Sequence, residues 1–302
     1  MLRLNEVKVP LDHSEDDLHA AVVDRLDIAL EDLLQCVVFR RAIDARKRSA
    51  IQLTYTLDVE VTDESSVLEE YEKLKQDGKV AITLDTGYHF VTQAPKELKG
   101  RPVVIGTGPC GLFAGLLLAQ MGFKPIILER GKIVRERTQD TWGFWRKSLL
   151  KPESNVQFGE GGAGTFSDGK LYSQIKDKRH IARKVLTEFV KAGAPEEILY
   201  VAKPHIGTFR LVKIVENMRA SIESLGGEFR FQNKVTDLLV DDRQVKGVTL
   251  ANGESITSDH VILAIGHSAR DTFRVLHDQG VYMEAKPFSI GFRIEHPQSL
   301  ID

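Results

Sequence analysis

Cysteine is scarce in this chain of 302 residues, which contains only Cys36 and Cys110. The two form no C-x-x-C pair, so the sequence predicts neither a disulfide-reductase dithiol nor a cysteine zinc site. We expect no metal site. The N-terminus is too charged for a signal peptide, and together with so few cysteines this favours the reducing cytoplasm.

A large excess of one charge is also missing, since the formal net charge is −2. That balance does not indicate nucleic acid or another polyanion as a partner. The charge is uneven along the chain, because residues 1–100 carry 13 Lys and Arg against 20 Asp and Glu. The two parts could attract one another or a negatively charged cofactor, or the first part could simply have an acidic solvated face.

Long apolar runs are limited to residues 103–123, which approach the length of a membrane span. This run holds five glycines and Pro109, and another strand pattern follows at once. We interpret it as a strand, a turn and a buried helix, and we expect no membrane association.

Hydrophobic periodicity divides the chain into two parts. Residues 1–98 predict a small α+β domain, and the polar stretch 93–100 predicts a linker. In the first part we expect strands at 2–9, 37–43, 51–61, 80–84 and 89–92 and helices at 14–26 and 65–78. Beyond residue 130 we expect an irregular segment to 180, helices at 181–192 and 209–225, and strands at 228–232, 235–240, 245–250 and 260–265.

The strongest motif follows the apolar residues 103–105 and reads Gly106-Thr107-Gly108-Pro109-Cys110-Gly111. This G-x-G-x-x-G lies between a predicted strand and a predicted helix, the context that a dinucleotide-binding turn requires. Gly106 allows the tight turn, Gly108 lets backbone approach a pyrophosphate, and Gly111 lets the helix pack on the strand. Pro109 suits the first helical position, and the helix N-terminus would face the phosphates. Cys110 is either a redox thiol or a small packing residue, and we favour packing.

The second strand of this βαβ unit ends at Glu129, 18 residues after Gly111. A carboxylate there can accept hydrogen bonds from an adenosine ribose and would repel a 2′-phosphate, which argues against NADP. The alternative is a glycine-rich turn followed by a surface acid. Strand, turn, helix, strand and acid occur in the required order, so we predict a dinucleotide site.

An NAD-binding Rossmann domain usually continues with further βα units, but this chain enters a long loop after Gly131. The loop has five glycines within residues 159–169, which costs backbone entropy and makes sense where backbone lies against a flat ligand. A flexible surface loop is the alternative, and Phe158, Phe166 and Leu171 argue against it because they would anchor the segment in a core. The pattern favours FAD over NAD.

Four segments together resemble the bacterial flavoproteins known as NAD(FAD)-utilising or FAD-dependent dehydrogenases. The segments are Phe158–Leu171, Glu129–Gly131, His205–Thr208 and Gly266–Asp271. The resemblance covers nearly the whole chain, and its glycine-rich segment is specific to that group. It implies an α/β fold in which a Rossmann-like FAD/NAD(P)-binding domain of the glutathione-reductase type follows a small α+β domain. It implies no particular substrate.

The resemblance also implies contacts with FAD. The three motif glycines would hold the pyrophosphate, Glu129 the ribose and the backbone of Val235 the adenine. The glycine-rich loop would approach the flavin, and the strand that ends at Gly266 would form a second FAD fingerprint. The predicted cofactor-binding residues are Gly106, Gly108, Pro109, Cys110, Gly111, Glu129, Arg130, Gly159, Gly161, Gly162, Ala163, Gly164, Thr165, Val235, Ala264 and Gly266.

We therefore predict an FAD-dependent oxidoreductase that acts on a small molecule, with NAD(P)H as a candidate electron donor. The alternatives are a flavin-binding sensor or RNA-associated protein that uses FAD structurally, and an NAD-only dehydrogenase. The predicted domains are 1–98 (α+β), 99–280 (FAD-binding) and 281–302 (start of a substrate domain). Relatives continue further, and residues 288–294 alternate like a strand with no later partner, so we expect a C-terminally truncated, weakly active chain in which 281–302 pack poorly.

No catalytic residue can be assigned, because the flavin would carry the redox chemistry. His267 could face the flavin or cap the next helix, and we favour the structural role. Lys170 could stabilise an anionic flavin or lie on the surface. Arg293 and His296 could bind an acidic group of a substrate.

For two further groups of residues we favour a structural role over a role in binding. Trp142 and Trp145 are expected to pack in a core rather than to stack on flavin. The basic residues at 40–48 could contact RNA, but they lack interleaved aromatic residues and lie in an acidic domain, so we predict a solvated hairpin.

Overall fold

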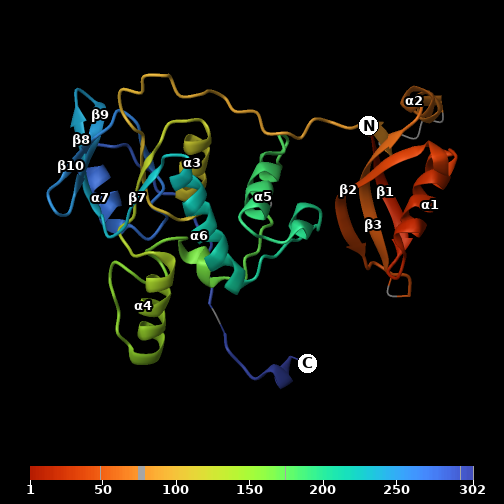
Figure 1. The fold of residues 1–302 in the computed structure, drawn as a ribbon. Coiled ribbons are helices and arrows are strands. Elements are labelled where there is room, and N and C mark those ends of the chain that lie inside the picture. Colours follow the sequence, from red (N-terminus) through yellow and green to blue (C-terminus); the bar gives the residue numbers. More distant parts are fainter. Residues whose placement is uncertain (48, 74–78, 174, 293, 302) are drawn as a thin grey trace.

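The computed structural model describes residues 1–47, 49–73, 79–173, 175–292 and 294–301. An N-terminal α+β unit and a larger α/β unit are joined by an extended segment (Figure 1). The last part of the helix predicted at 65–78 lies outside the described residues, as does Arg293.

The N-terminal unit is an antiparallel sheet in the order β2-β3-β1-β4. Helix α1 packs on it through Leu18, Val22 and Leu26, and Ser14 caps that helix by accepting a hydrogen bond from the Asp17 N–H at 3.1 Å. The elements are β1 (Leu2–Pro10), α1 (Glu15–Leu26), β2 (Leu33–Asp44), β3 (Gln52–Val61), α2 (Glu64–Lys73) and β4 (Val80–Ile82). Most of the predicted elements of this unit are confirmed.

The strand predicted at 89–92 is wrong. This segment instead contacts the larger unit through side chains and one backbone hydrogen bond. The centres of the Tyr88 and Phe90 rings lie 5.5 and 5.0 Å from the Lys184 ammonium. The Ala94 N–H donates to the Met121 carbonyl at 2.7 Å. A strand needs a partner edge for its backbone groups, and in the structure this segment pairs with none among the described residues.

The larger unit is built on a parallel sheet in the order β11-β5-β6-β7. Its strands are β5 (Val103–Ile105), β6 (Ile126–Leu128), β7 (Glu228–Arg230) and β11 (Val261–Leu263). Strand residues alternate between the two faces, so Val104 joins one apolar cluster while Val103 and Ile105 join another. Both faces are covered, which explains the continuous apolar runs. The exception is β11, which has a continuous apolar run but lies at the edge of the sheet and leaves Leu263 41% exposed.

Helices cover one face of the parallel sheet and a second sheet covers the other. The helices on the first face are α3 (Pro109–Gln120), α4 (Val134–Lys147), α5 (Ile181–Lys191) and α6 (Thr208–Ser224). The second sheet contains β8 (Val235–Asp241), β9 (Gln244–Leu250) and β10 (Ser255–Thr257), and α7 (Arg270–Asp278) packs against β8. Leu116 of α3 and Ile222 of α6 share a cluster with Val104, whereas Val248 of β9 packs with Val103. The predicted α/β fold with a Rossmann-like sheet is confirmed.

Helix α4 forms where the sequence predicted irregular structure. It buries Val134, Arg137 and Thr141, which are three and four residues apart and so share one helical face. Trp142 and Trp145 lie off that face and are 46% and 53% exposed, so the prediction that they pack in a core is wrong. Their rings contact each other edge to face, with centroids 5.5 Å apart.

The two units touch along strand β2, an edge strand of the N-terminal sheet. The Arg41 N–H donates to the Tyr200 carbonyl at 2.7 Å, and the Ala202 N–H donates back to the Arg41 carbonyl at 2.9 Å. The Arg183 guanidinium of α5 lies 4.9 Å from the centre of the Phe39 ring. Segment 200–202 therefore adds a short parallel bridge to the N-terminal sheet.

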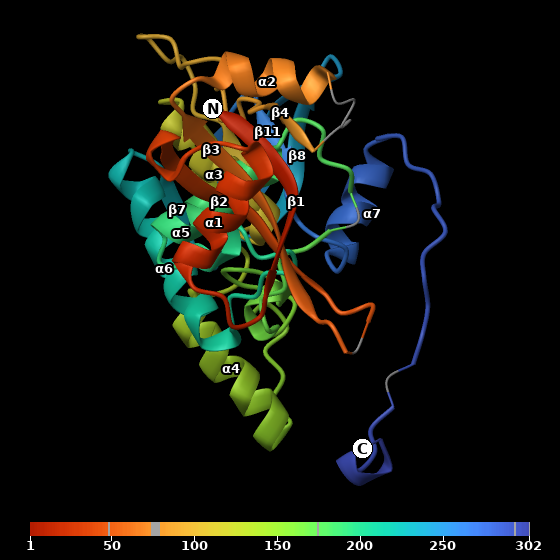
Figure 2. The same cartoon turned by 90° about the vertical axis from the view of Figure 1, so that its right-hand side faces the viewer.

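Residues 281–292 and 294–301 leave the body of the molecule and run down one side (Figure 2). Phe288 is 84% exposed and Phe292 100% exposed. The strand predicted at 288–294 does not form over the described part of that range, because no sheet edge lies beside it, although the predicted poor packing is present. Across the described residues, no helix has both the length and the apolar character that crossing a membrane requires.

Candidate functional site

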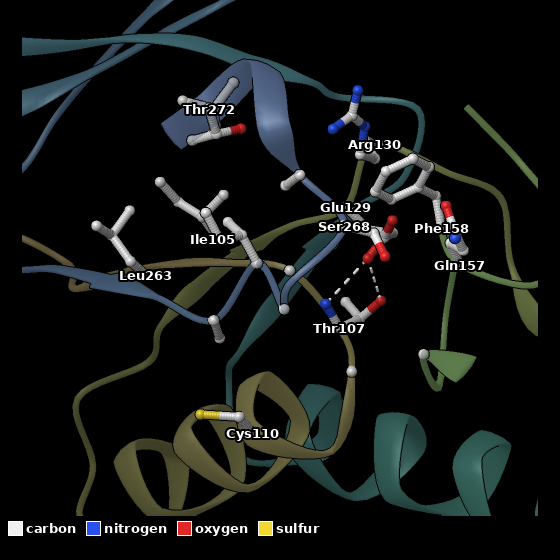
Figure 3. A pocket seen from close by; sticks show the side chains of 18 of the residues that line it. Ile105, Thr107, Cys110, Glu129, Arg130, Gln157, Phe158, Leu263, Ser268 and Thr272 are labelled. Atoms are coloured by element: carbon white, nitrogen blue, oxygen red, sulfur yellow. Dashed lines mark hydrogen bonds between the residues drawn. The ribbon is translucent and has the colours of Figure 1, made fainter. Parts of the chain in front are cut away.

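A pocket of about 510 Å³ opens at the carboxyl ends of β5, β6 and β11, the edge at which ligands bind in parallel α/β sheets. Its walls come from the turn after β5, the end of β6, the glycine-rich segment, the start of β8 and the connection from β11 to α7 (Figure 3). The volume is in the ordinary range for small-molecule sites.

The structure brings most of the sequence-predicted site residues to this pocket. Those that line it are Gly106, Gly108, Pro109, Cys110, Glu129, Arg130, Gly159, Gly162, Ala163, Val235, Ala264 and Gly266. The others lie behind or beside the wall: Gly111 and Gly161 are buried, as is Thr165, and Gly164 is exposed. His267 lines the pocket, whereas Lys170 lies outside it, exposed and 3.6 Å from Asp168.

Two of the three motif glycines are required by the fold, and the third, Gly108, is not. A Cβ on Gly106 would lie 2.5 Å from the Ala264 carbonyl oxygen, and Gly106 has φ +100°. A Cβ on Gly111 would overlap the Gly106 carbonyl. A Cβ on Gly108 would meet nothing closer than Gly162 Cα at 3.9 Å, and its φ of −65° is open to any residue. Gly108 therefore leaves empty space in the pocket without being required for the turn.

Helix α3 begins beside this space with Gly108 as its N-cap and Pro109 as its first residue. No side chain caps the helix, so the positive end of the helix dipole faces the pocket without a side chain over it. Cys110 is exposed on the first turn and also lines the pocket. An anionic group would be stabilised here by the helix dipole.

Glu129 occupies the end of β6 and is only 4% exposed. One carboxylate oxygen accepts from the Thr107 N–H at 2.9 Å and from the Thr107 hydroxyl at 2.6 Å. The other accepts from the N–H groups of Gly131 and Gly159 at 2.8 and 3.0 Å. The carboxylate thus joins the glycine turn to the glycine-rich segment, and its predicted contact with a ribose stays a prediction.

The two glycine-containing segments are in direct backbone contact. The Gly161 N–H donates to the Thr107 carbonyl at 2.9 Å. A Cβ on Gly162 would lie 2.9 Å from Gly108 Cα, and Gly162 has φ +64°. This close approach requires glycine at 162 and explains why the segment is rich in that residue.

Arg137 was missed by the sequence analysis, although it shapes the pocket wall. Its side chain is fully buried and donates 2.7 Å hydrogen bonds to the carbonyls of Asn155, Val156 and Glu160. The guanidinium also lies 4.9 Å from the centre of the Phe166 ring. Burial lowers the pKa of Arg137 to about 10, so the group stays charged at neutral pH. It fixes the backbone of residues 155–160.

Glu160 is the second buried charged residue that sequence did not indicate. Its side chain is completely buried, accepts a 2.7 Å hydrogen bond from the Val134 N–H and lies 3.0 Å from Arg219 Nε. Burial raises the pKa of the Glu160 carboxyl to about 7. The acid therefore fastens the N-terminus of α4 to the glycine-rich segment.

The basic residues at 40–48 are partly engaged within the protein. The backbone of Arg41 bonds to segment 200–202, and Arg46 forms a two-pronged contact with Asp44. The hydrogen bond to Arg46 holds the pKa of Asp44 well below its usual range. The described part of this hairpin offers no specific observation in favour of RNA binding.

Comparisons with known proteins give one match along the whole chain and several partial ones. Residues 1–60 match the family described as "Domain of unknown function (DUF8436)". An uncharacterized protein of Clostridium beijerinckii is 42% identical over 301 residues, which cover 100% of this chain and 55% of that protein. The chain therefore spans about half the length of this curated relative.

Solved structures are similar over part of the chain at low identity. THI4 of Thermovibrio ammonificans has a TM-score of 0.41 and 18% identity, covering 72% of this chain and 68% of that one. The GidA-related protein of Thermus thermophilus has a TM-score of 0.32 and 15% identity, covering 55% and 53%. The OTEMO complex with FAD and NADP has a TM-score of 0.34 and 18% identity, covering 57% and 26%. Because these scores are all below 0.5, a functional assignment has to rest on the pocket's own residues.

Proposed function

We propose that this chain binds FAD and forms the cofactor-binding part of an FAD-dependent oxidoreductase. The observation that carries the proposal is the open space at Gly108, which lies between the N-terminus of α3 and the backbone of Gly162 inside a pocket of about 510 Å³. A side chain at 108 would fill that space although the turn itself does not need glycine there. Such a cradle, at the end of a parallel strand, suits a pyrophosphate.

The rest of the pocket supports an adenosine diphosphate group in the same place. Glu129 and Arg130 end the neighbouring strand, where a ribose lies in Rossmann-type sites. Val235, 8% exposed, lines the wall beyond them. These features support a dinucleotide with its phosphates at the cradle, its ribose beside Glu129 and its adenine against the apolar wall.

FAD is preferred to NAD because of the segment that the chain builds after β6. The chain does not return at once to the sheet with a βα unit, but builds α4 and a glycine-rich wall fastened by Glu129 and Arg137. That wall presents backbone beside the phosphate cradle, which suits a flat and extended ligand. The resemblance of Phe158–Leu171 to FAD-dependent dehydrogenases points the same way. FAD, when bound, would supply the hydride-accepting chemistry.

The oxidoreductase activity extends the proposal beyond the pocket. The substrate would be a small molecule and NAD(P)H would be the electron donor, with the reaction completed by the parts that the longer relative has and this chain does not cover. The chain's own residues would bind the adenosine diphosphate half and orient the cofactor.

The direct test is the absorbance spectrum of the purified full chain. We expect bound flavin, released on denaturation and identified as FAD by its mass, with slow bleaching under anaerobic NADH or NADPH. Bound FAD that neither pyridine nucleotide reduces would support the sensor alternative. A colourless protein that binds NAD but not FAD would contradict the proposal.

A further inference from the structure

Four charged side chains from four separate segments form a closed ring at one rim of the pocket. Arg130 Nε lies 2.5 Å from Glu153, and its two terminal nitrogens donate to the two oxygens of Asp271 at 3.0 and 2.8 Å. Lys234 Nζ bridges the same carboxylates, 3.0 Å from Glu153 and 2.8 Å from Asp271. The ring joins the end of β6, the loop after α4, the start of β8 and the first turn of α7.

The two cations of the ring line the pocket, and the two carboxylates hold them from outside its wall. Arg130 and Lys234 are among the lining residues, whereas Glu153 and Asp271 are not. The Arg130 side chain is 14% exposed and its guanidinium lies 4.1 Å from the centre of the Phe158 ring (Figure 3). Stacking and two-sided pairing therefore fix its orientation.

The ring occupies the place where a dinucleotide site would recognise its ribose. Arg130 follows Glu129 directly, and in Rossmann-type sites a free arginine near this position binds a 2′-phosphate. Here the donor groups of Arg130 and Lys234 already face carboxylates. The hydrogen bonds from Arg130 hold the pKa of Asp271 well below its usual range, so that carboxylate remains charged at neutral pH.

We propose that the ring of Arg130, Glu153, Lys234 and Asp271 selects adenosine diphosphate ligands with a free 2′-hydroxyl and rejects those with a 2′-phosphate. This inference rests on the proposed function and names the ligand class that its site accepts. A 2′-phosphate would have to displace two carboxylates from their cations or lie beside them as a like charge. Close contact between like charges near a protein surface is unfavourable.

The test is a competition experiment on the full chain, in which ADP or 2′-phospho-ADP displaces FAD and the release is followed by flavin fluorescence. In the wild type we expect ADP to compete at least about tenfold better, corresponding to about 1.4 kcal/mol. In the double variant Glu153→Gln, Asp271→Asn, both cations are freed while side-chain size is kept. The preference should then fall about tenfold, to near equality.

Glu254→Gln is the matched control, since Glu254 is an acid outside the pocket that pairs with Arg230, and it should leave the preference unchanged. Asp271→Asn alone covers the case in which the double variant does not fold, and the preference should fall partway. An unchanged preference in the folded double variant, or in Asp271→Asn, would overturn the inference. If no FAD is bound, the proposed function itself is wrong. If FAD is bound but ADP does not displace it, the adenosine diphosphate half does not lie beside the ring and the inference is overturned.

Discussion

Glu129 and Thr107 are joined by two hydrogen bonds to one carboxylate oxygen, one from the Thr107 backbone N–H and one from its hydroxyl. The second oxygen accepts from Gly131 and Gly159. A single buried acid thus organises both glycine segments of the pocket before any ligand arrives.

The substitution Glu129→Ala should destabilise the empty protein as well as weaken cofactor binding. Four buried donors would lose their acceptor, and we expect the free energy of unfolding to fall by about 2–4 kcal/mol. FAD affinity should fall by about 1–3 kcal/mol. Urea unfolding without ligand and titration with FAD measure the two effects. Unchanged values in both would show that the Glu129 carboxylate contributes neither to stability nor to cofactor binding.

Gly108→Val should abolish flavin retention without harming the fold. The new side chain would enter the cradle, where a Cβ meets nothing closer than 3.9 Å, and we expect FAD affinity to fall at least about 100-fold. Gly143→Val on α4 is the matched control, because a Cβ there meets nothing within 4 Å and Gly143 is outside the pocket. Equal flavin content in the two variants would contradict the phosphate cradle.

The pH dependence of stability should contain a contribution from Glu160. Burial raises the pKa of its carboxyl from 4.5 to about 7, so between these values the folded chain holds a proton that the unfolded chain has released. The stabilisation from this group is present at low pH and is lost as the pH rises through that window. Glu160→Gln cannot titrate, and its loss of stability between about pH 5 and about pH 8 should be smaller than that of the wild type by about 2 kcal/mol.

Urea unfolding at both pH values tests this expectation, with Glu223→Gln on the exposed part of α6 as the control. The same pH dependence in Glu160→Gln and the wild type would show that the carboxyl titrates normally.

We expect that removal of one backbone N–H donor, that of Arg41, weakens the contact between the two units. The Arg41 N–H points away from β3 toward the Tyr200 carbonyl, and an edge strand tolerates proline on its outer side. Arg41→Pro should loosen segment 200–207, whose Pro204 carbonyl accepts from the Leu171 N–H at 3.0 Å and whose Ile206 N–H donates to the Gly169 carbonyl at 3.0 Å. We expect amide exchange at 169–171 to rise about tenfold.

Ile43→Pro provides the comparison, because Ile43 is two residues along the same strand and its N–H is on the same outer side. Hydrogen–deuterium exchange read at residues 169–171 decides the matter. Equal protection in the two variants would mean that the N-terminal unit does not support the glycine-rich segment.

Local patterns in the sequence determined the βαβ unit and the cradle. The apolar residues 103–105, the glycine spacing of the motif and the acid at 129 lie within a short stretch, so their geometry follows from local sterics and strand periodicity. The capped helix after Ser14 and the helices near 181–191 and 208–224 were predicted for the same reason. The βαβ unit carries six of the twelve predicted residues that line the pocket.

Only the tertiary structure decided the rest, because it depends on partners far apart in the chain. Arg137 lies in a polar stretch and becomes a buried residue only when the carbonyls of 155–160 fold around it. Asp271 meets Arg130 across 141 positions, which no local pattern records. The alternation at 288–294 predicts a strand, yet a strand forms only where a neighbouring edge takes its hydrogen bonds.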